Sequence, residues 1–545
     1  MSDTPQSERL VALAETMFTF GQSDEGDPFA VDSSEPGIVI PLRGRFRSCL
    51  AALYRRNNGK PPSAGPLSDA MTVLTGVAQD APRSPVSLRV ARDGNALVVD
   101  LGNPDNARCV VIEAGTWNVK DHPPAGVLFR RTALTAALPE PDEPGTGDLA
   151  RLYELTNVPA ADEAVLSAWL VSALVPEIPH PPLAIQGQQG TAKTTTGRCM
   201  VRTVDPSPAP LRTAARSLDE WAIAANGSWV VGIDNVSGLS PTIQDAICRT
   251  ATGDGLVRRE LYTDAGLAVL SYKRCVLLTG IDLGALRGDL ADRTLLVHPD
   301  PIRPEARRLD AEIEAAFTDA WPTITAGLYD LTAQVLELLP DVHLENAPRM
   351  ADFARIVAAV DAATGTTGLA RYAEHARDLA DEVLEADTVA GAVRAFMADR
   401  TAWTGTASDL LAALPAPTPT PKSWPTTPHH LSARLRRTLD ALAGAGIVAD
   451  LDQRTASGRS ITLTRGAHDA NDAHLPFSYL GKKKERKKER PASASQASAS
   501  SHPDLDLGPS DDVPDHTLDA APPFERVPDH VLAQWEDLDT QGDEA

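Results

Sequence analysis

In the first part of the chain, apolar residues occur first at helical spacing and then in short strand-like runs. Apolar residues recur at helical spacing over residues 7–20 and 46–79, which predicts helices. Over residues 87–131 the pattern changes to the alternating runs SLRVA, ALVVDL, RCVVIEA and VLFRR, separated by Gly-containing turns. These runs predict a small antiparallel sheet. The Pro- and Gly-rich stretch LPEPDEPGTG then ends the unit, so we expect a mixed α+β N-terminal region over residues 1–145.

Strands and helices alternate over residues 146–305. After an apolar helix at 164–174, the short strands PLAIQG, SWVVGID, RCVLLTG and RTLLVH alternate with helices that start near residues 193 and 241. Such alternation predicts a mostly parallel sheet covered by helices. Residues 306–386 are almost wholly helical in pattern, with main pieces ARRLDAEIEAAFTDAWPTI, LYDLTAQVLELL and MADFARIVAAVDAATG, and form a predicted helical extension.

A third unit is expected over residues 387–465. It shows two helices, a Pro-rich connection, a third helix HHLSARLRRTLDALAGAG, and two strands around an Ala-Ser-Gly turn. This order is typical of a winged helix. Beyond Gly466 apolar periodicity is lost, and the run KKKERKKER, a Ser/Ala repeat and an acidic stretch predict a disordered, basic-then-acidic tail over 466–545.

Charge and cysteine content narrow the possible classes of protein. The chain has 545 residues and a formal net charge of −23, but residues 501–545 alone hold thirteen acidic residues and one basic residue. The body is therefore only mildly acidic, and local basic patches stay possible. Five cysteines without a Cys-x-x-Cys pair indicate neither a disulfide framework nor a zinc finger. With no signal-peptide pattern and no apolar run of about 18 residues, we expect a cytoplasmic protein.

The most informative stretch follows the strand LAIQ and precedes a helix. It matches the phosphate-binding pattern G-x-x-x-x-G-K-[ST], except that Ala192 replaces the second glycine. Backbone N–H groups would enclose the phosphates of ATP, Lys193 would neutralise phosphate oxygens, and Thr194 would offer its hydroxyl to Mg²⁺. We expect Ala192 to take a backbone conformation compatible with a Cβ. The predicted nucleotide-binding residues are Gly187, Gln188, Gln189, Gly190, Thr191, Ala192, Lys193, Thr194 and Thr195. The alternative is a Gly- and Thr-rich turn with a chance lysine.

A second acidic signal lies some forty residues further on. The strand WVVGI ends in Asp234-Asn235. An acid at the carboxyl end of a strand beside the phosphate loop can hold the water shell of Mg²⁺, so Asp234 and Thr194 form the predicted metal site. A buried strand ending in an Asx turn is the alternative. Asn235 stands where a glutamate commonly orients water, so the residues point to nucleotide binding more directly than to hydrolysis.

Two further blocks, TGDGLVRRELY at 252–262 and LRGDLADR at 286–293, complete the pattern. With them, residues 180–300 resemble the superfamily 3 helicases, an AAA+ class found in phage and plasmid primase-helicases. The chain is also similar over most of its length to uncharacterised ATP-binding proteins of actinobacterial mobile elements. The fold implied is a multidomain α/β chain with a P-loop, AAA+-like core.

The resemblance implies roles for individual residues. Lys193, Thr194 and Asp234 would serve nucleotide and magnesium, and Thr279 would occupy a sensor position at the tip of its strand. Arg293 would reach the γ-phosphate of a neighbouring subunit in a ring, expected to be a hexamer. Arg258 and Arg259 would grip DNA in the ring's channel. Thr279 departs from the usual Asn and the channel arginines from the usual Lys, so ordinary surface ion pairs remain an alternative for these arginines.

Clustered arginines in the third unit suit DNA phosphates and base edges. Arg434, Arg436 and Arg437 are expected on the third helix and Arg459 beside the wing. A protein-docking module with solvated arginines is the alternative. In the tail, helical spacing predicts a segment that docks a replication partner, with a merely solubilising tail as the alternative. Its apolar residues are Val531, Leu532, Trp535 and Leu538.

The sequence therefore predicts an ATP- and Mg²⁺-dependent, DNA helicase-like ATPase that acts in the replication of a phage or mobile genetic element. The competing hypothesis is a nucleotide-responsive DNA-binding initiator or regulatory ATPase that does not unwind DNA. A small-molecule kinase fits poorly because no acceptor-binding lid is visible.

Overall fold

The computed structural model describes residues 4–253, 256–259, 267–270, 272–280, 288–345, 348–417, 419–421, 424–455 and 458–465. The predicted disordered tail, including the docking segment around Trp535, lies outside the described residues. Within the described part of the chain, no helix is both long and apolar enough to cross a membrane.

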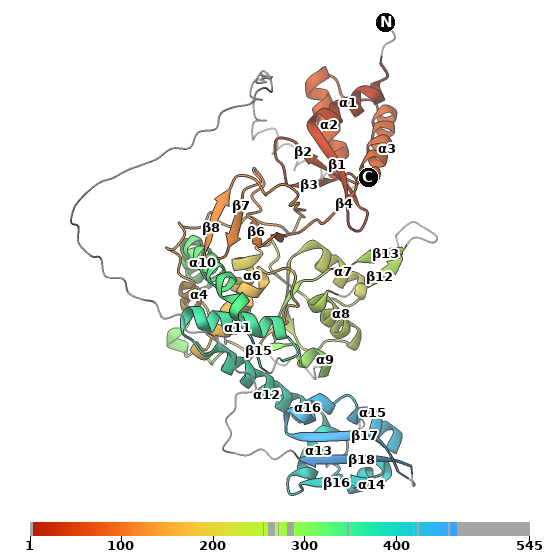
Figure 1. The fold of residues 1–545 in the computed structure, drawn as a ribbon, viewed down its shortest axis with the longest axis vertical. Coiled ribbons are helices and arrows are strands. Elements are labelled where there is room, and N and C mark those ends of the chain that lie inside the picture. The colour runs from red at the N-terminus through yellow and green to blue at the C-terminus, as the bar shows by residue number, and fades with distance from the viewer. Residues whose placement is uncertain are drawn as a thin grey trace, which may run out of the picture. The chain divides into compact units, whose positions relative to one another are not determined.

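Residues 4–84 form a layer of helices on a small sheet (Figure 1). Its elements are α1 (Gln6–Met17), β1 (Phe18–Ser23), β2 (Pro28–Asp32), β3 (Val39–Pro41), α2 (Arg45–Asn58), α3 (Ala64–Asp80) and β4 (Arg83–Ser84), with strand order β3-β2-β1-β4. The helix expected to reach residue 20 ends at Met17, and this sheet was not predicted. The reason is tertiary: Phe18 and Phe20 both pack edge-on against the ring of Phe46 from α2, which favours the extended backbone.

A second sheet confirms the antiparallel prediction. It contains β5 (Val90–Asp93), β6 (Ala96–Asp100), β7 (Cys109–Glu113) and β8 (Thr116–Lys120), each paired antiparallel with the next. The expected strand at 127–131 was wrong, because Phe129 makes only isolated bridges, to Ile38 and Ser87.

The central sheet is parallel, as predicted. Its strands β9 (Leu183–Gln186), β10 (Leu211–Arg212), β11 (Val230–Val236), β14 (Cys275–Gly280) and β15 (Leu295–Val297) lie in the order β10-β11-β14-β9-β15. The other elements of this region are α4 (Ala150–Leu155), α5 (Glu163–Ala173), α6 (Lys193–Val204), α7 (Leu218–Gly227), α8 (Pro241–Thr252), β12 (Leu256–Arg259), β13 (Leu267–Leu270) and α9 (Gly288–Ala291). β10 and α7 were not predicted. Because every pair in the sheet is parallel, all carboxyl ends meet at one edge.

The helical extension has fewer breaks than expected. It contains α10 (Asp310–Leu338), α11 (Ala351–Thr364) and α12 (Gly368–Ala386). The first two predicted pieces are one helix, which continues through Pro322. The hydroxyl of Thr325, in the turn after the proline, donates to the carbonyl oxygens of Trp321 and Pro322.

The last described unit has the predicted order of helices and strands, with one extra strand. It contains α13 (Thr388–Met397), β16 (Ala402–Gly405), α14 (Ala407–Ala413), α15 (Pro428–Leu435), α16 (Leu439–Gly444), β17 (Ile447–Thr455) and β18 (Gly458–Arg465), with β18 between β16 and β17. The single third helix was wrong: it breaks after Leu435. The Thr438 hydroxyl bonds back to the carbonyls of Arg434 and Leu435 at the break, an alternative to helix continuation that short polar side chains offer.

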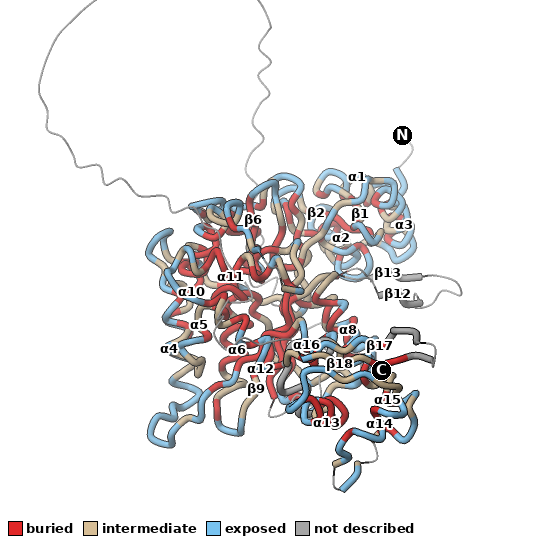
Figure 2. Tube along the Cα trace, turned by 60° about the horizontal axis from the view of Figure 1, so that its bottom comes forward, coloured by how far each residue is buried: buried red, intermediate tan, exposed pale blue. Residues whose placement is uncertain are grey.

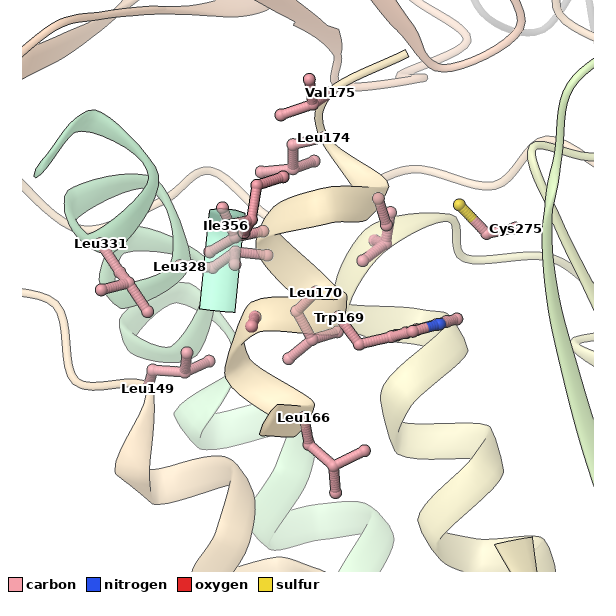
Figure 3. Packing of buried hydrophobic residues seen from close by; sticks show 14 of the residues in the cluster. Leu149, Leu166, Trp169, Leu170, Leu174, Val175, Cys275, Leu328, Leu331 and Ile356 are labelled. Carbon is pink, nitrogen blue, oxygen red and sulfur yellow. The ribbon is translucent and has the colours of Figure 1, made fainter. Parts of the chain in front are cut away.

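The main apolar core surrounds α5. Figure 3 shows Trp169 and Leu170 of α5 near Leu328 of α10 and Ile356 of α11. Figure 2 shows these buried segments in red. The same core includes Trp117 of β8, whose ring lies edge-on to Tyr329 of α10. The second sheet and the parallel sheet therefore share apolar contacts, although the sequence pattern places a boundary near residue 145.

Candidate functional site

A loop joins β9 to α6 at the carboxyl edge of the parallel sheet. The N–H of Gly187 donates to the carbonyl of Gly280 on β14 over 3.1 Å, and the Thr191 hydroxyl donates to the carbonyl of Gln188 over 3.0 Å. The Lys193 ammonium folds back onto that same carbonyl at 2.6 Å. Burial lowers the pKa of Lys193, while Asp234 acts in the opposite direction. The loop thus holds a cation beside the amino end of a twelve-residue helix, an arrangement that suits an anion.

Ala192 corrects one expectation about this loop. It has φ +56° and ψ +27°, the left-handed region that glycine favours, rather than a conformation that a Cβ tolerates well. The turn into α6 therefore needs the backbone of a glycine although the sequence supplies an alanine. We infer local strain at this position.

Asn157 supports the loop from outside the predicted site. Its side-chain amide donates to the carbonyls of Thr191 and Asp300, and its backbone N–H donates to the Thr196 hydroxyl over 3.2 Å. Arg307 also comes close, because one of its terminal nitrogens lies 3.5 Å from where a Cβ on Gly190 would stand. Sequence reasoning missed both residues, since a single Asn in a turn and an Arg in a charged run carry no pattern.

Three elements bring Thr194, Asp234 and Thr279 together. The Thr194 hydroxyl on α6 donates to Oδ1 of Asp234 on β11 over 3.0 Å. The buried Thr279 hydroxyl on β14 donates to the same oxygen and accepts the backbone N–H of Asn235 at 3.3 Å. β14 lies between β9 and β11. We expected the acid on a strand beside the loop. Asp234 instead lies on β11, which is separated from β9 by β14, and its carboxylate extends toward Thr194.

Asn235 has an exposed side chain and φ +53°. Asparagine adopts this left-handed conformation more readily than most residues. The conformation re-aims the chain directly after Asp234, where the pairing of β11 with β14 shifts register.

The residues present fit a magnesium ion that is shared with a phosphate. Mg²⁺ is commonly held by one or two protein oxygens plus phosphate oxygens and waters, and the paired Thr194 hydroxyl and Asp234 carboxylate match that donor set. Among the described residues, no group of three or more His, Cys, Asp or Glu could hold a metal by itself.

Arg293 lies away from these residues. It precedes β15, whose first residue, Leu295, pairs with Leu183 at the start of β9. That is the amino edge of the sheet, opposite the 187–192 loop. The Arg293 guanidinium pairs with Asp289 at 3.2 Å, and 17% of its side chain is exposed. Within one subunit, therefore, the structure does not bring Arg293 to the loop.

The predicted DNA-binding arginines divide into three groups. Arg258 and Arg259 lie on β12, which pairs with β13 in a hairpin, and Arg459 lies on β18; their side chains are outside the described part. Arg434 lies on α15 and pairs with Asp387 at 2.7 Å. We expected Arg436 and Arg437 on the third helix. They lie instead in the break between α15 and α16, and both are exposed.

Fold and site together define a multidomain α/β protein, built on a parallel sheet with a strand–loop–helix element and an acidic residue at one edge. Residues 149–382 match the family model described as "Actinomycete integrative conjugative element replication protein", and residues 389–479 match that of the "AICE RepA C-terminal domain". The two matches together span more than half of the chain. The chain belongs to this family of replication proteins.

Solved structures offer distant likenesses. One is described as "SCCmec type IV Cch - active helicase", with 12% identity, a TM-score of 0.40, and coverage of 82% of this chain and 93% of that chain. Another is the apo "NrS-1 C terminal region (305-718)", with 11% identity, a TM-score of 0.35, and coverage of 85% and 100%. No curated protein matches the sequence.

Proposed function

We propose that the protein is an ATP-binding, Mg²⁺-dependent ATPase that acts in the cytoplasm as a DNA helicase-like motor during replication of an integrative conjugative element. The observation that carries the proposal is the contact between Thr194 and Asp234 at the end of a loop with the pattern G-x-x-x-x-A-K-T. A hydroxyl after the loop lysine and a strand-end carboxylate are the two protein groups that such sites use toward magnesium. Membership in a replication protein family agrees with the proposed role.

In this proposal the 187–192 backbone and Lys193 bind the phosphates. Lys193 would exchange the Gln188 carbonyl for a phosphate oxygen. This exchange is favourable because the ammonium is partly buried, and an anion stabilises its charge more than a neutral carbonyl does. Asn157 would keep the loop in place through the Thr191 carbonyl. Magnesium, when bound, would neutralise phosphate charge. Asp234 would orient its water shell, and Thr279 would fix the Asp234 carboxylate.

DNA contacts and assembly complete the proposal. Arg258 and Arg259 would contact a DNA strand in the channel of a homo-oligomeric ring, expected to be a hexamer. The unit from α13 to β18 would act as a winged helix on duplex DNA, through Arg436, Arg437 and Arg459. Arg434 contributes less to DNA binding in this view, because Asp387 already neutralises it. The tail around Trp535 would recruit a replication partner.

A second function deserves a test because of Asn235. A neutral amide cannot accept the proton of an attacking water as a glutamate does. A protein with such a site can use ATP binding for assembly on DNA, as an initiator without unwinding activity. Slow basal turnover is expected under either function.

One experiment separates these functions. Wild type, Lys193→Ala and the surface control Lys120→Ala would be compared for Mg-ATP binding, ATPase rate with and without forked DNA, and strand displacement. We expect loss of nucleotide binding in Lys193→Ala alone. Nucleotide binding by Lys193→Ala at the wild-type level would refute the ATP site. DNA-stimulated turnover by the wild type without displacement would favour the initiator.

A further inference from the structure

A basic segment in the N-terminal unit has no assigned role. Between Glu35 and Asp69 the chain contains six basic residues and no acidic residue, although its net charge is −23. Four of the six lie on α2, and the other two lie within two residues of its ends. Such segregation of charge is unexpected for a helix that only covers a core.

The buried side of α2 leaves the basic side chains to solvent. Phe46, Leu50, Leu53 and Tyr54 face the core of the N-terminal unit. All six basic residues are exposed, and the outer side of this unit is drawn in pale blue in Figure 2. Arg45 and Arg56 lie eleven residues apart on the same side of the helix, which corresponds to about 16 Å along its axis. Arg55 lies about a quarter turn and Arg47 nearly half a turn around the helix from Arg45, so the cations cover the exposed half of α2 as a broad row rather than a point.

Five of the six cations have no acidic partner among the described residues. Arg45, Arg47, Arg55, Arg56 and Lys60 form no ion pair and donate no side-chain hydrogen bond to any residue that the structure describes. Other arginines have acidic partners, as the half-buried Arg92 does with Glu177 and the half-buried Arg108 with Glu140. Cations without acidic partners can pair with the phosphate groups of a nucleic-acid backbone.

A groove lies between the start of α2 and α3. Its first wall is formed by Arg43, Gly44 and Arg47, and its second wall carries the Ser68 hydroxyl and the side chains of Thr72 and Thr75. The hydroxyls of Thr72 and Thr75 donate to the carbonyls of Ser68 and Met71 on their own helix. No acidic residue lines this groove. Hydroxyls and arginines are among the groups that most often contact phosphate and sugar oxygens.

We propose that α2 and the adjoining groove form a sequence-independent DNA-binding surface that contacts the phosphate backbone through Arg45, Arg47, Arg55, Arg56 and Lys60. This contact is additional to those in the ring channel and the winged helix. It rests on the proposed function in taking DNA as the partner, but it requires neither ATP binding nor hydrolysis. The two proposals can therefore fail separately.

The test measures the salt dependence of DNA binding by the full chain without nucleotide. Arg55→Gln/Arg56→Gln removes two charges from the row, Arg55→Lys/Arg56→Lys keeps them, and Arg151→Gln/Arg377→Gln removes two exposed charges elsewhere. A labelled oligonucleotide would be titrated as single strand and as duplex between about 50 and 300 mM salt. ATP binding and the melting temperature of each variant serve as checks of folding.

We expect only the Arg55→Gln/Arg56→Gln slope to become shallower. Each lost contact lowers the log–log slope by about 0.7 on single strands or about 0.9 on duplex, so the double variant loses up to about 1.4 or about 1.8. The surface binds the form of DNA on which the change in slope reaches its expected value, about 1.4 on single strands or about 1.8 on duplex. An unchanged slope in a folded variant would overturn the proposal. So would an effect that disappears when residues 501–545 are deleted, because the surface would then bind the acidic tail.

Discussion

Thr194 and Asp234 lie forty residues apart in the sequence, yet the hydroxyl of one donates to the carboxylate of the other over 3.0 Å. Thr194 lies in the first turn of α6, which follows β9, and Asp234 lies near the end of β11, which is separated from β9 by one strand. Parallel strand direction brings them to one edge, and the Thr279 hydroxyl holds the same carboxylate oxygen from the strand between. The two groups are thus pre-positioned on rigid elements.

Asp234→Ala should preserve nucleotide binding without metal and remove the increase that Mg²⁺ provides. Loss of the carboxylate removes the group that would orient the ion, and metal stabilisation of transferring phosphate is worth several kcal/mol, so turnover should fall by about 10³-fold or more. The measurements are ATP affinity with Mg²⁺ or EDTA and the ATPase rate. Asp319→Asn, an exposed acid on α10, is the control. A magnesium dependence equal to wild type in Asp234→Ala would place the metal elsewhere.

Ala192→Gly tests the strain in the loop. Left-handed backbone costs an alanine about 1–2 kcal/mol, while glycine loses about 0.5–1 kcal/mol more entropy on folding. We therefore expect unchanged to slightly higher stability, by up to about 1.5 kcal/mol, in urea denaturation. Ala315→Gly, on an exposed turn of α10, should lose about 1 kcal/mol. Equal losses in both variants would show that Ala192 is not strained.

The loop and the acid were predictable because their signals are local in the sequence. Gly187 to Thr194 must supply consecutive N–H groups, a lysine and a hydroxyl, and a strand-end acid announces itself by the apolar run before it. The left-handed Ala192 and the support by Asn157 were not predictable, because both depend on where distant backbone lies. The Asp300 carbonyl that Asn157 contacts is 143 residues away.

The broken third helix shows the same limit. Apolar periodicity continues from His429 to Gly444, so pattern alone favours one helix. Bonds from the Thr438 side chain to the preceding turn end α15 instead. As a consequence, the proposed DNA-binding residues Arg436 and Arg437 lie in a turn, where side chains project in other directions than on a helix face.

Arg293→Ala examines the proposed contact between subunits. Arg293 lies at the sheet edge opposite its own loop, so only a neighbour's loop could receive it. An arginine supplied in trans is worth about 10³–10⁵ in rate, so ATP binding should persist while turnover is lost. Adding Lys193→Ala, which still carries Arg293, should restore part of the activity at mixed interfaces.

The ion pair with Asp289 offers the structural alternative for Arg293. If both variants assemble like wild type and mixing restores nothing, Arg293 does not act across subunits. A lowered melting temperature in Arg293→Ala, matched by Asp289→Asn, would then assign it to holding α9.

Acid should weaken the attachment of α12 to the segment before α5. Asp162 is fully buried and accepts from Arg371 at 2.5 Å and from His375 at 2.8 Å. Burial acts to raise the pKa of Asp162, but the hydrogen bonds and charges of His375 and Arg371 outweigh it and lower the pKa below its usual range. A carboxyl with a depressed folded-state pKa stabilises the fold above its unfolded pKa of about 3.9, and this contribution is lost as pH falls through the folded value.

Asp162→Asn should therefore cost stability at neutral pH, by about 1.5–3 kcal/mol, the usual range for hydrogen bonds to charged groups. The difference from wild type should shrink below about pH 4. Urea denaturation at neutral and acidic pH measures both. A difference that stays constant with pH would show that the Asp162 charge is not what stabilises the contact.

Gly327→Ala should be among the most destabilising small changes in the chain. A Cβ on Gly327 would stand 2.4 Å from the backbone nitrogen of Leu149, and one on Gly147 would stand 2.0 Å from the nitrogen of Gly327. Both obstacles are backbone, so no side chain can rotate away. This close approach continues at Asp330, which accepts from Trp117 Nε1 at 2.7 Å and from the N–H of Gly147, so α10, β8 and the chain before α4 meet here.

Forced overpacking typically costs about 1–3 kcal/mol, and with backbone on both sides we expect the upper end of that range. Gly76→Ala on α3 is the matched control, because its Cβ would meet nothing within 4 Å, and it should gain up to about 1 kcal/mol from helix propensity. Urea denaturation midpoints give both changes in unfolding free energy, provided that the m-values of the variants equal that of the wild type. Because α10 and α5 share the core that supports β9, Gly327→Ala should also weaken ATP binding at temperatures near its melting transition. A midpoint equal to wild type would mean that the segment before α4 can move off α10 at no cost.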